Sequence, residues 1–237
     1  ADVRIAKTDK TGDATLSGAL IEVRNSEGEI ICRDYTGEDG YLPALPAVPG
    51  TYTYREVLAP EGYALDDTEM TFTINEQGEV VGQTTIADEF SRFSIRKVDP
   101  QHRPLEGVEY GLFREDGTLH STAVTDSEGL ATFERIPYGS YTIEEIKQLP
   151  GYVKDHTKTP ITVDGTFKNP DAPIAKLTNC PTELLVQKVD QNSVALAGAQ
   201  FGLFDEKDEL VMTAVSDAEG LVHFVGAAVG KYTICEL

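Results

Sequence analysis

The sequence of 237 residues contains no tryptophan and no long apolar run, and these absences exclude several classes of protein. Without tryptophan, and with few other aromatic residues expected at the surface, it lacks the flat apolar faces on which sugars stack. No apolar stretch is long enough to cross a bilayer as a helix. No basic and then apolar leader opens the sequence, so we expect a mature segment or an excised piece.

Basic residues are also scarce. There are 20 Lys and Arg against 40 Asp and Glu, which gives a formal net charge of −20. Such a charge repels the phosphates of nucleic acids and the anionic headgroups of membranes. We therefore expect neither nucleic acid as a partner nor insertion into a membrane.

Cysteine and histidine give no sign of a metal, cofactor or catalytic site. Three cysteines, Cys32, Cys180 and Cys235, are an odd number at unrelated spacings, which fits no disulfide framework and no zinc motif. The four histidines share no spacing, and no glycine-rich phosphate loop or cysteine–histidine nucleophile motif is present. We expect no cofactor, no metal and no enzymatic turnover, and cysteine content does not indicate the compartment.

What the sequence does contain is a long repeat. In the stretch Phe93 to Asp99, strict alternation places Phe93, Ile95 and Lys97 on one face of a strand, so a lysine lies among apolar residues. The same order recurs twice, as Val3, Ile5, Lys7 and as Leu184, Val186, Lys188. The three lysines are 90 and 91 positions apart, a period that indicates tandem domains rather than a solenoid.

The repeat divides the sequence into three all-β units, residues 1–90, 91–181 and 182–237. Turn residues separate short alternating runs, and helical periodicity is absent. In the first unit we expect a final hairpin formed by residues 70–74 and 79–87. The third unit stops before its counterpart of that hairpin, so we expect an incomplete sandwich with a bare edge.

Each of the first two units has three polar side chains on otherwise apolar strand faces. They are Lys7, Glu56 and Asp88 in the first unit and Lys97, Glu145 and Asn179 in the second. The third unit has Lys188 and Glu236 at the matching positions but no acceptor, so we expect Lys188 to be an unpaired bond former and Glu236 an unpaired promoter.

Three inward polar groups per unit predict that the groups meet inside the sandwich. Burial lowers the pKa of an amine and raises that of a carboxylic acid, so a proton can pass from one to the other. The neutral amine that results is a nucleophile, and a protonated glutamate can polarise a side-chain carbonyl beside it. The expected product is an isopeptide bond, with loss of ammonia from Asn179 or water from Asp88.

The competing interpretation is a buried ion pair in which nothing reacts. Asn179 favours the reaction, because a neutral amide compensates a buried lysine poorly and is a suitable electrophile. The first unit is more ambiguous, because Lys7 and Asp88 could form a simple salt bridge beside a protonated Glu56.

Several short motifs support a family resemblance. They are Lys-x-Asp at the start of each unit, Gly-Ala-x-Phe (Gly198 to Phe201), Thr-Asp-x-x-Gly (Thr125 to Gly129), Gly-x-Tyr-x-x-x-Glu (Gly50 to Glu56 and Gly139 to Glu145), Ala-Pro-x-Gly-Tyr (Ala59 to Tyr63) and Leu-Thr-Asn (Leu177 to Asn179). Together they resemble the collagen-adhesin B-type domains of Gram-positive surface proteins, also called SpaA-type or prealbumin-like pilin domains. The resemblance covers the whole chain.

The resemblance implies tandem β-sandwiches of inverse immunoglobulin topology arranged as a rod. It implies isopeptide bonds from Lys97 to Asn179 and from Lys7 to Asp88, promoted by Glu145 and Glu56. The implied function is a stalk or pilin segment at the cell wall, with other pilin subunits or the wall as partners through sortase. The alternative function is an adhesin module that recognises a host protein or glycan through loops at the sandwich ends.

Overall fold

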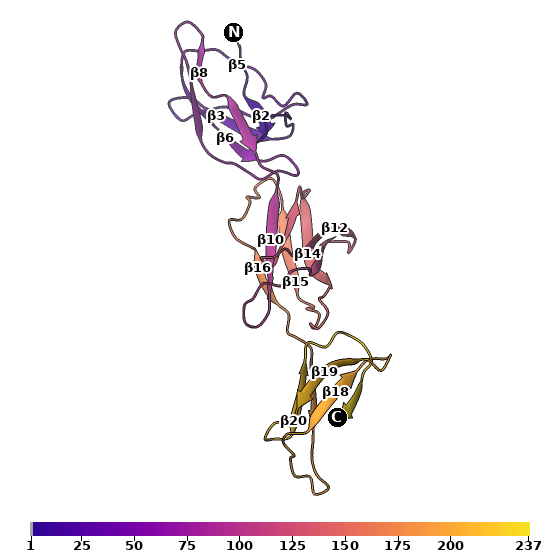
Figure 1. The fold of residues 1–237 in the computed structure, drawn as a ribbon. Coiled ribbons are helices and arrows are strands. Elements are labelled where there is room, and N and C mark those ends of the chain that lie inside the picture. Colours follow the sequence, from indigo (N-terminus) through magenta and orange to yellow (C-terminus); the bar gives the residue numbers. More distant parts are fainter. Residues whose placement is uncertain (1) are drawn as a thin grey trace.

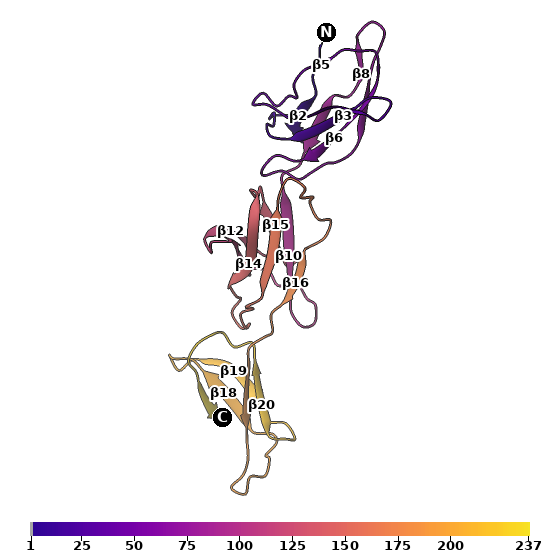
Figure 2. The same ribbon diagram turned by 180° about the vertical axis from the view of Figure 1, so that it is seen from behind.

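The computed structural model describes residues 2–237, which form three β-sandwich units placed end to end as a rod (Figures 1 and 2). Every regular element among these residues is a strand, so the all-β prediction is confirmed. No helix in the described part of the chain could span a membrane. Each unit packs its own apolar core between two layers of strands.

The first unit places a five-stranded sheet, in the order β4-β3-β6-β7-β8, against the pairs β2-β9 and β1-β5. Alternation along β6 (Gly50–Leu58) buries Tyr52, Tyr54 and Glu56 on one face, as the sequence predicts. The other strands are β1 (Asp2–Val3), β2 (Ala6–Asp9), β3 (Leu20–Arg24), β4 (Ile30–Tyr35), β5 (Leu45–Pro46), β7 (Met70–Ile74), β8 (Val80–Gly82) and β9 (Thr85–Asp88).

The second unit has a four-stranded sheet, β12-β11-β14-β15, facing a three-stranded sheet, β13-β10-β16. Phe93, Ile95 and Lys97 are all buried on one face of β10 (Arg92–Val98). The remaining strands are β11 (Glu109–Arg114), β12 (Leu119–Val124), β13 (Leu130–Glu134), β14 (Gly139–Lys147), β15 (Lys158–Val163) and β16 (Ala175–Thr178).

The third unit has fewer strands and a smaller core. Its sheets are β19-β18-β21 and β17-β20, and its buried core consists of Phe201, Leu203, Val222 and Phe224. Both β17 and β21 lie at the edge of a sheet. The strands are β17 (Glu183–Gln187), β18 (Gln200–Phe204), β19 (Leu210–Val215), β20 (Leu221–Val225) and β21 (Thr233–Glu236).

The predicted final hairpin of the first unit is wrong in one respect. Residues 79–87 do not form one strand, because β8 pairs with β7 while β9 lies in the opposite layer, parallel to β2. The break follows Gly82, whose φ of 113° suits glycine and redirects the chain. The second unit pairs its first and last strands in the same way, with β10 parallel to β16. In both of these units, the crossover places the closing strand beside the strand that carries the lysine.

Candidate functional site

In the first unit, the three predicted polar residues meet in the core. Lys7 comes from β2, Glu56 from β6 and Asp88 from β9, and none exposes more than 1% of its surface. Lys7 Nζ lies 3.0 Å from Glu56 Oε1 and donates a hydrogen bond to Asp88 Oδ1. The amine therefore touches both a candidate acceptor and a candidate proton carrier.

The two acids of the first unit hold their protons more firmly than ordinary carboxylic acids. Burial raises the pKa of Glu56 to about 8; the charge of Lys7 opposes this shift and that of Asp88 adds to it. Burial also raises the pKa of Asp88, again against the opposing effect of Lys7. At neutral pH, one buried acid of this trio is thus expected to be protonated.

The second unit assembles its own trio. Lys97 Nζ lies 3.0 Å from Glu145 Oε2, and Asn179 Nδ2 donates a hydrogen bond of 3.0 Å to Glu145 Oε1. All three residues are buried, and Asn179 Oδ1 has no hydrogen-bond partner. Glu145 thus bridges the amine and the amide, where it could carry a proton from one nitrogen to the other.

Sequence reasoning missed a fourth group in this site. Asp155 Oδ2 lies 3.1 Å from Lys97 Nζ, and the Asp155 side chain is 15% exposed. Burial acts to raise the pKa of Asp155, but hydrogen bonds from Thr157 and Lys97 outweigh it and hold that pKa below its ordinary value. A signal was present, because Gly-Tyr-x-x-Asp occurs in both units, ending at Asp66 and at Asp155.

Sequence reasoning also missed Tyr110, which lies opposite Glu145 on the neighbouring strand. Lys97 Nζ lies 5.7 Å from the centre of the tyrosine ring, and the buried hydroxyl has no hydrogen-bond partner. Burial, followed by the charges of Glu145 and Asp155, raises the pKa of Tyr110. The residues at the same position in the first and third units are Ile21 and Phe201, which have no hydroxyl group, so the Tyr110 hydroxyl distinguishes the second unit.

The third unit differs from the expected pattern. Lys188 Nζ lies 2.6 Å from Glu236 Oε2, so the two residues pair with each other. Their side chains are 28% and 47% exposed, which contradicts the predicted inward position of Glu236. The reason is that β21 is an edge strand, with no further strand on its outer side in the described structure. Water therefore reaches the pair.

The family model for the SpaA prealbumin-like fold domain matches residues 1–89, 91–172 and 182–237. The chain belongs to this family. The resemblance inferred from the motifs is therefore confirmed, and the matches follow the three-fold repeat. In this SpaA-type chain, Asn179 lies between the second and third matched ranges.

Three known proteins are similar to this SpaA-type chain over most or all of its length. Serine-aspartate repeat-containing protein F of Staphylococcus epidermidis is 23% identical over an aligned length of 269 positions. The match covers 92% of this chain but only 15% of that protein. The Bacillus anthracis TIE protein structure is 26% identical, with a TM-score of 0.46, and covers 100% of this chain and 45% of that one. A streptococcal ancillary pilin structure is 16% identical, with a TM-score of 0.43, and the match covers 100% of this chain and 90% of that one.

Histidine and cysteine gather at no common point in the SpaA-type units. Across residues 2–237, no group of three or more His, Cys, Asp or Glu side chains is placed to hold a metal ion. Cys32, Cys180 and Cys235 are all free thiols.

Proposed function

We propose that the chain is a structural stalk segment whose first two units become cross-linked through isopeptide bonds between their own first and last strands. The units are taken as residues 1–90, 91–181 and 182–237. The observation that carries the proposal is the second trio, in which a buried carboxyl group bridges a buried lysine amine and a buried side-chain amide. An ion pair alone gives no role to Asn179.

In the second unit, the proposed step is a transamidation. Glu145 accepts a proton from the Lys97 ammonium, and the neutral Nζ attacks Asn179 Cγ. The Nζ–Cγ bond forms while the Cγ–Nδ2 bond breaks, and the proton held by Glu145 passes to Nδ2, so that ammonia leaves. Glu145 then takes up the second proton that Nζ gives up on becoming an amide nitrogen. Holding both groups in one buried site replaces a bimolecular encounter with an intramolecular one.

In the first unit, the same attack on Asp88 Cγ releases water instead of ammonia. A protonated acid is a better electrophile than its carboxylate, and the raised pKa of Asp88 favours that form. The raised pKa of Glu56 lets it act as the proton donor near neutral pH. Each bond forms once, so the chain modifies itself and has no turnover.

The proposed bonds fit a load-bearing role. Each one joins the first strand of a unit to its last, and these are the strands through which a pulling force enters and leaves. Tension would then pass through a covalent link rather than the hydrogen bonds of the sheets. Membership of a prealbumin-like family and the rod of successive sandwiches support a pilin-like or adhesin stalk at a Gram-positive cell surface. Its neighbours there would be other subunits or the cell wall.

Intact mass spectrometry tests the proposal directly. The mass of the purified chain is expected to be lower than the mass calculated from its sequence by one ammonia plus one water. Peptide mapping should recover peptides in which Lys97 is joined to Asn179 and Lys7 to Asp88. In the Glu145→Gln variant the loss of ammonia should disappear and the loss of water remain. In the Glu56→Gln variant the loss of water should disappear and the loss of ammonia remain. The full sequence mass, with all four residues unmodified, would leave only buried ion pairs and defeat the proposal.

A further inference from the structure

The site of the first unit is covered by a loop, residues 59–67, that follows β6. The loop packs back onto its own unit, since the Asp66 N–H donates to Glu56 Oε2 at 3.3 Å and the Ala64 N–H donates to the Glu89 carbonyl at 3.0 Å. Ala59 and Ala64 are buried. The conformation of this loop therefore decides what surrounds Glu56.

A segment of the second unit, residues 164–169, holds that loop by its backbone. The Ala59 N–H donates to the Gly165 carbonyl at 2.8 Å, and the Leu65 N–H donates to the Phe167 carbonyl at 2.7 Å. The segment lies in the connection between β15 and β16. In the first unit the equivalent connection, between β7 and β9, forms β8 instead.

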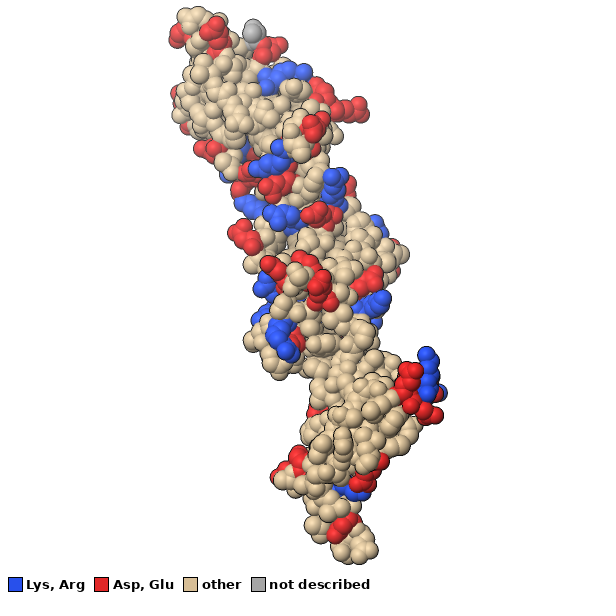
Figure 3. All heavy atoms as spheres, viewed as in Figure 1, with Lys and Arg blue, Asp and Glu red and all other residues tan. Residues whose placement is uncertain are grey.

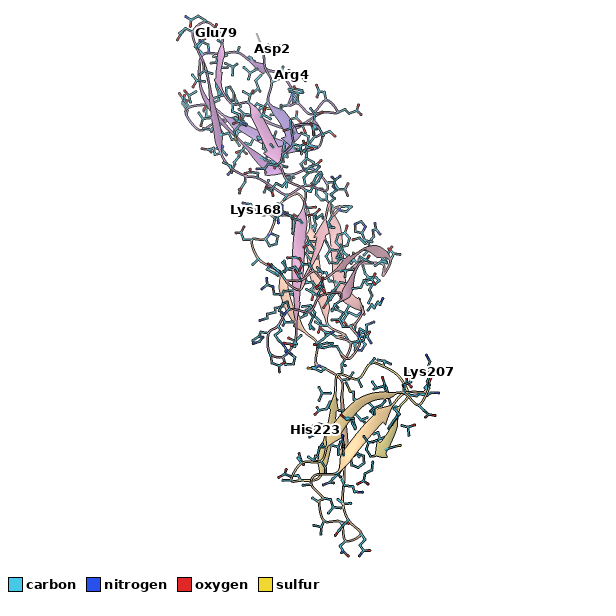
Figure 4. All side chains as sticks on the ribbon, viewed as in Figure 1. Asp2, Arg4, Glu79, Lys168, Lys207 and His223 are labelled. Carbon is cyan, nitrogen blue, oxygen red and sulfur yellow. The ribbon has the colours of Figure 1, made fainter. Side chains whose placement is uncertain are left out.

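Side chains add to the contact between the two units. Lys168 Nζ lies 2.6 Å from Asp67 Oδ1, and the Tyr138 hydroxyl donates to the Ala59 carbonyl. Lys168 is visible at this boundary in Figure 4, and charged side chains of both signs gather there in Figure 3. A Cβ on Gly165 would lie 3.0 Å from Leu58 Cβ, so the segment fits closely against the end of β6.

The equivalent loop of the second unit, residues 148–156, makes one contact that the first loop also makes: the Gly151 carbonyl accepts the Thr182 N–H at 2.8 Å, as the Gly62 carbonyl accepts the Ser91 N–H at 2.9 Å. Among the described residues, however, no third-unit backbone bonds correspond to those made by Gly165 and Phe167. There, Asp155 turns inward and pairs with Lys97. In the first unit, the counterpart Asp66 makes no ion pair with Lys7 among the described side chains, although it binds Thr68 much as Asp155 binds Thr157.

We propose that residues 164–169 of the second unit are a positioning element for the first unit's site. They hold the 59–67 loop closed, so that Asp66 offers its N–H to Glu56 and keeps its carboxylate away from Lys7. Lys7 then faces only Glu56 and its acceptor, Asp88. This inference rests on the proposed cross-linking, and it implies that the second unit must be folded before the first unit reacts.

The test is a triple variant of the full chain, Tyr138→Phe/Gly165→Val/Lys168→Ala, which weakens the contact and alters no reacting residue. A matched control, Lys158→Ala/Tyr232→Phe, removes one ion pair and one tyrosine hydrogen bond elsewhere. Hydrogen exchange should become at least about fivefold faster at the amides of residues 59, 65 and 66, because hydrogen bonds of about 1 kcal/mol each are weakened. The fraction of chains linked between Lys7 and Asp88 should fall.

The second unit serves as an internal standard. The bond between Lys97 and Asn179 should stay complete in both variants, which also shows that the second unit folds. Unchanged exchange at the three amides would overturn the inference, as would faster exchange with an unchanged linked fraction. If the parent chain has no bond at Lys7, the proposed function fails for that unit. Positioning is then judged by acylation of Lys7 with an amine-reactive ester, expected to be faster in the triple variant than in the control.

Discussion

The first and second units place the same lysine and glutamate at the same points of the fold, yet their surroundings differ. Each lysine touches two carboxyl groups, Glu56 and Asp88 in the first unit and Glu145 and Asp155 in the second. Asp88 is fully buried and its pKa is raised, whereas Asp155 reaches solvent and its pKa is lowered. Deep burial at Asp88 and the hydrogen bonds from Thr157 and Lys97 at Asp155 thus decide which acid keeps its proton.

The acceptor is the other difference, and it has consequences for the chemistry. An amide cannot compensate the charge of a lysine, so Asn179 forms no ion pair with Lys97 that would stabilise the unreacted state. Asp88 can form an ion pair with Lys7, which gives the unreacted state of the first unit an alternative stabilisation. The comparison therefore predicts complete linkage in the second unit and a linked fraction in the first that depends on conditions.

The largest expected effect comes from removing either acceptor. Asn179→Ala or Asp88→Ala should abolish the bond in its own unit and lower that unit's free energy of unfolding by about 4 kcal/mol, if a loop of roughly 80 residues behaves as it does in a disulfide. Calorimetry combined with intact mass would measure both changes. The exposed Asn192→Ala is the control. Equal stability of parent and variants would argue against any covalent link.

Exchanging the acceptors should exchange the leaving groups. Asp88→Asn is expected to give a chain lighter than its own sequence by two ammonia molecules, and its first unit should link more completely because the competing ion pair is gone. Asn179→Asp should lose water from the second unit and link less completely. High-resolution mass spectrometry distinguishes the two losses. If Asn at position 88 fails to link while Asp links, the electrophile argument is wrong.

A third prediction concerns pH. An unfolded glutamate releases its proton near pH 4.5, whereas folded Glu56, whose pKa is raised to about 8, keeps it until higher pH. Between these values the folded state binds more protons than the unfolded state, so stability falls as pH rises from about 5 to about 8 and then levels off. The loss should be on the order of a few kcal/mol. Thermal unfolding at pH 5 and pH 8 measures it, and Glu56→Gln should flatten the curve.

Much of the fold and most of the site followed from the sequence, because period-2 alternation fixes which side chains face inward. Lys7, Glu56 and Asp88 are buried as that parity requires. Period-2 alternation gives the wrong position where tertiary context overrides the local pattern. Residues 79–87 alternate as one strand but change layers after Gly82, and Glu236 has inward parity but lies on an exposed edge strand.

Asp155 and Tyr110 were missed for a different reason. Asp155 lies in a loop, where no periodicity indicates the direction of a side chain, and it reaches Lys97 only because the loop folds back. Tyr110 is buried on β11, but parity alone does not show that its hydroxyl would lie near a lysine. Neither could be assigned without the packing of the two sheets.

The smallest expected effect separates the two loop aspartates. In a chain carrying Asn179→Ala, where Lys97 keeps its amine, adding Asp155→Asn should destabilise the second unit by about 2 kcal/mol, because the buried amine loses one charged partner but keeps Glu145. In a chain carrying Asp88→Ala, adding Asp66→Asn should lower the free energy of unfolding of the first unit by a smaller amount, since Asp66 makes no ion pair with Lys7 in the described structure. Urea unfolding of the matched variants measures both. Equal costs at Asp66 and Asp155 would show that the two loops hold their lysines alike, and the contrast between the first two sites would then lie in their acceptors alone.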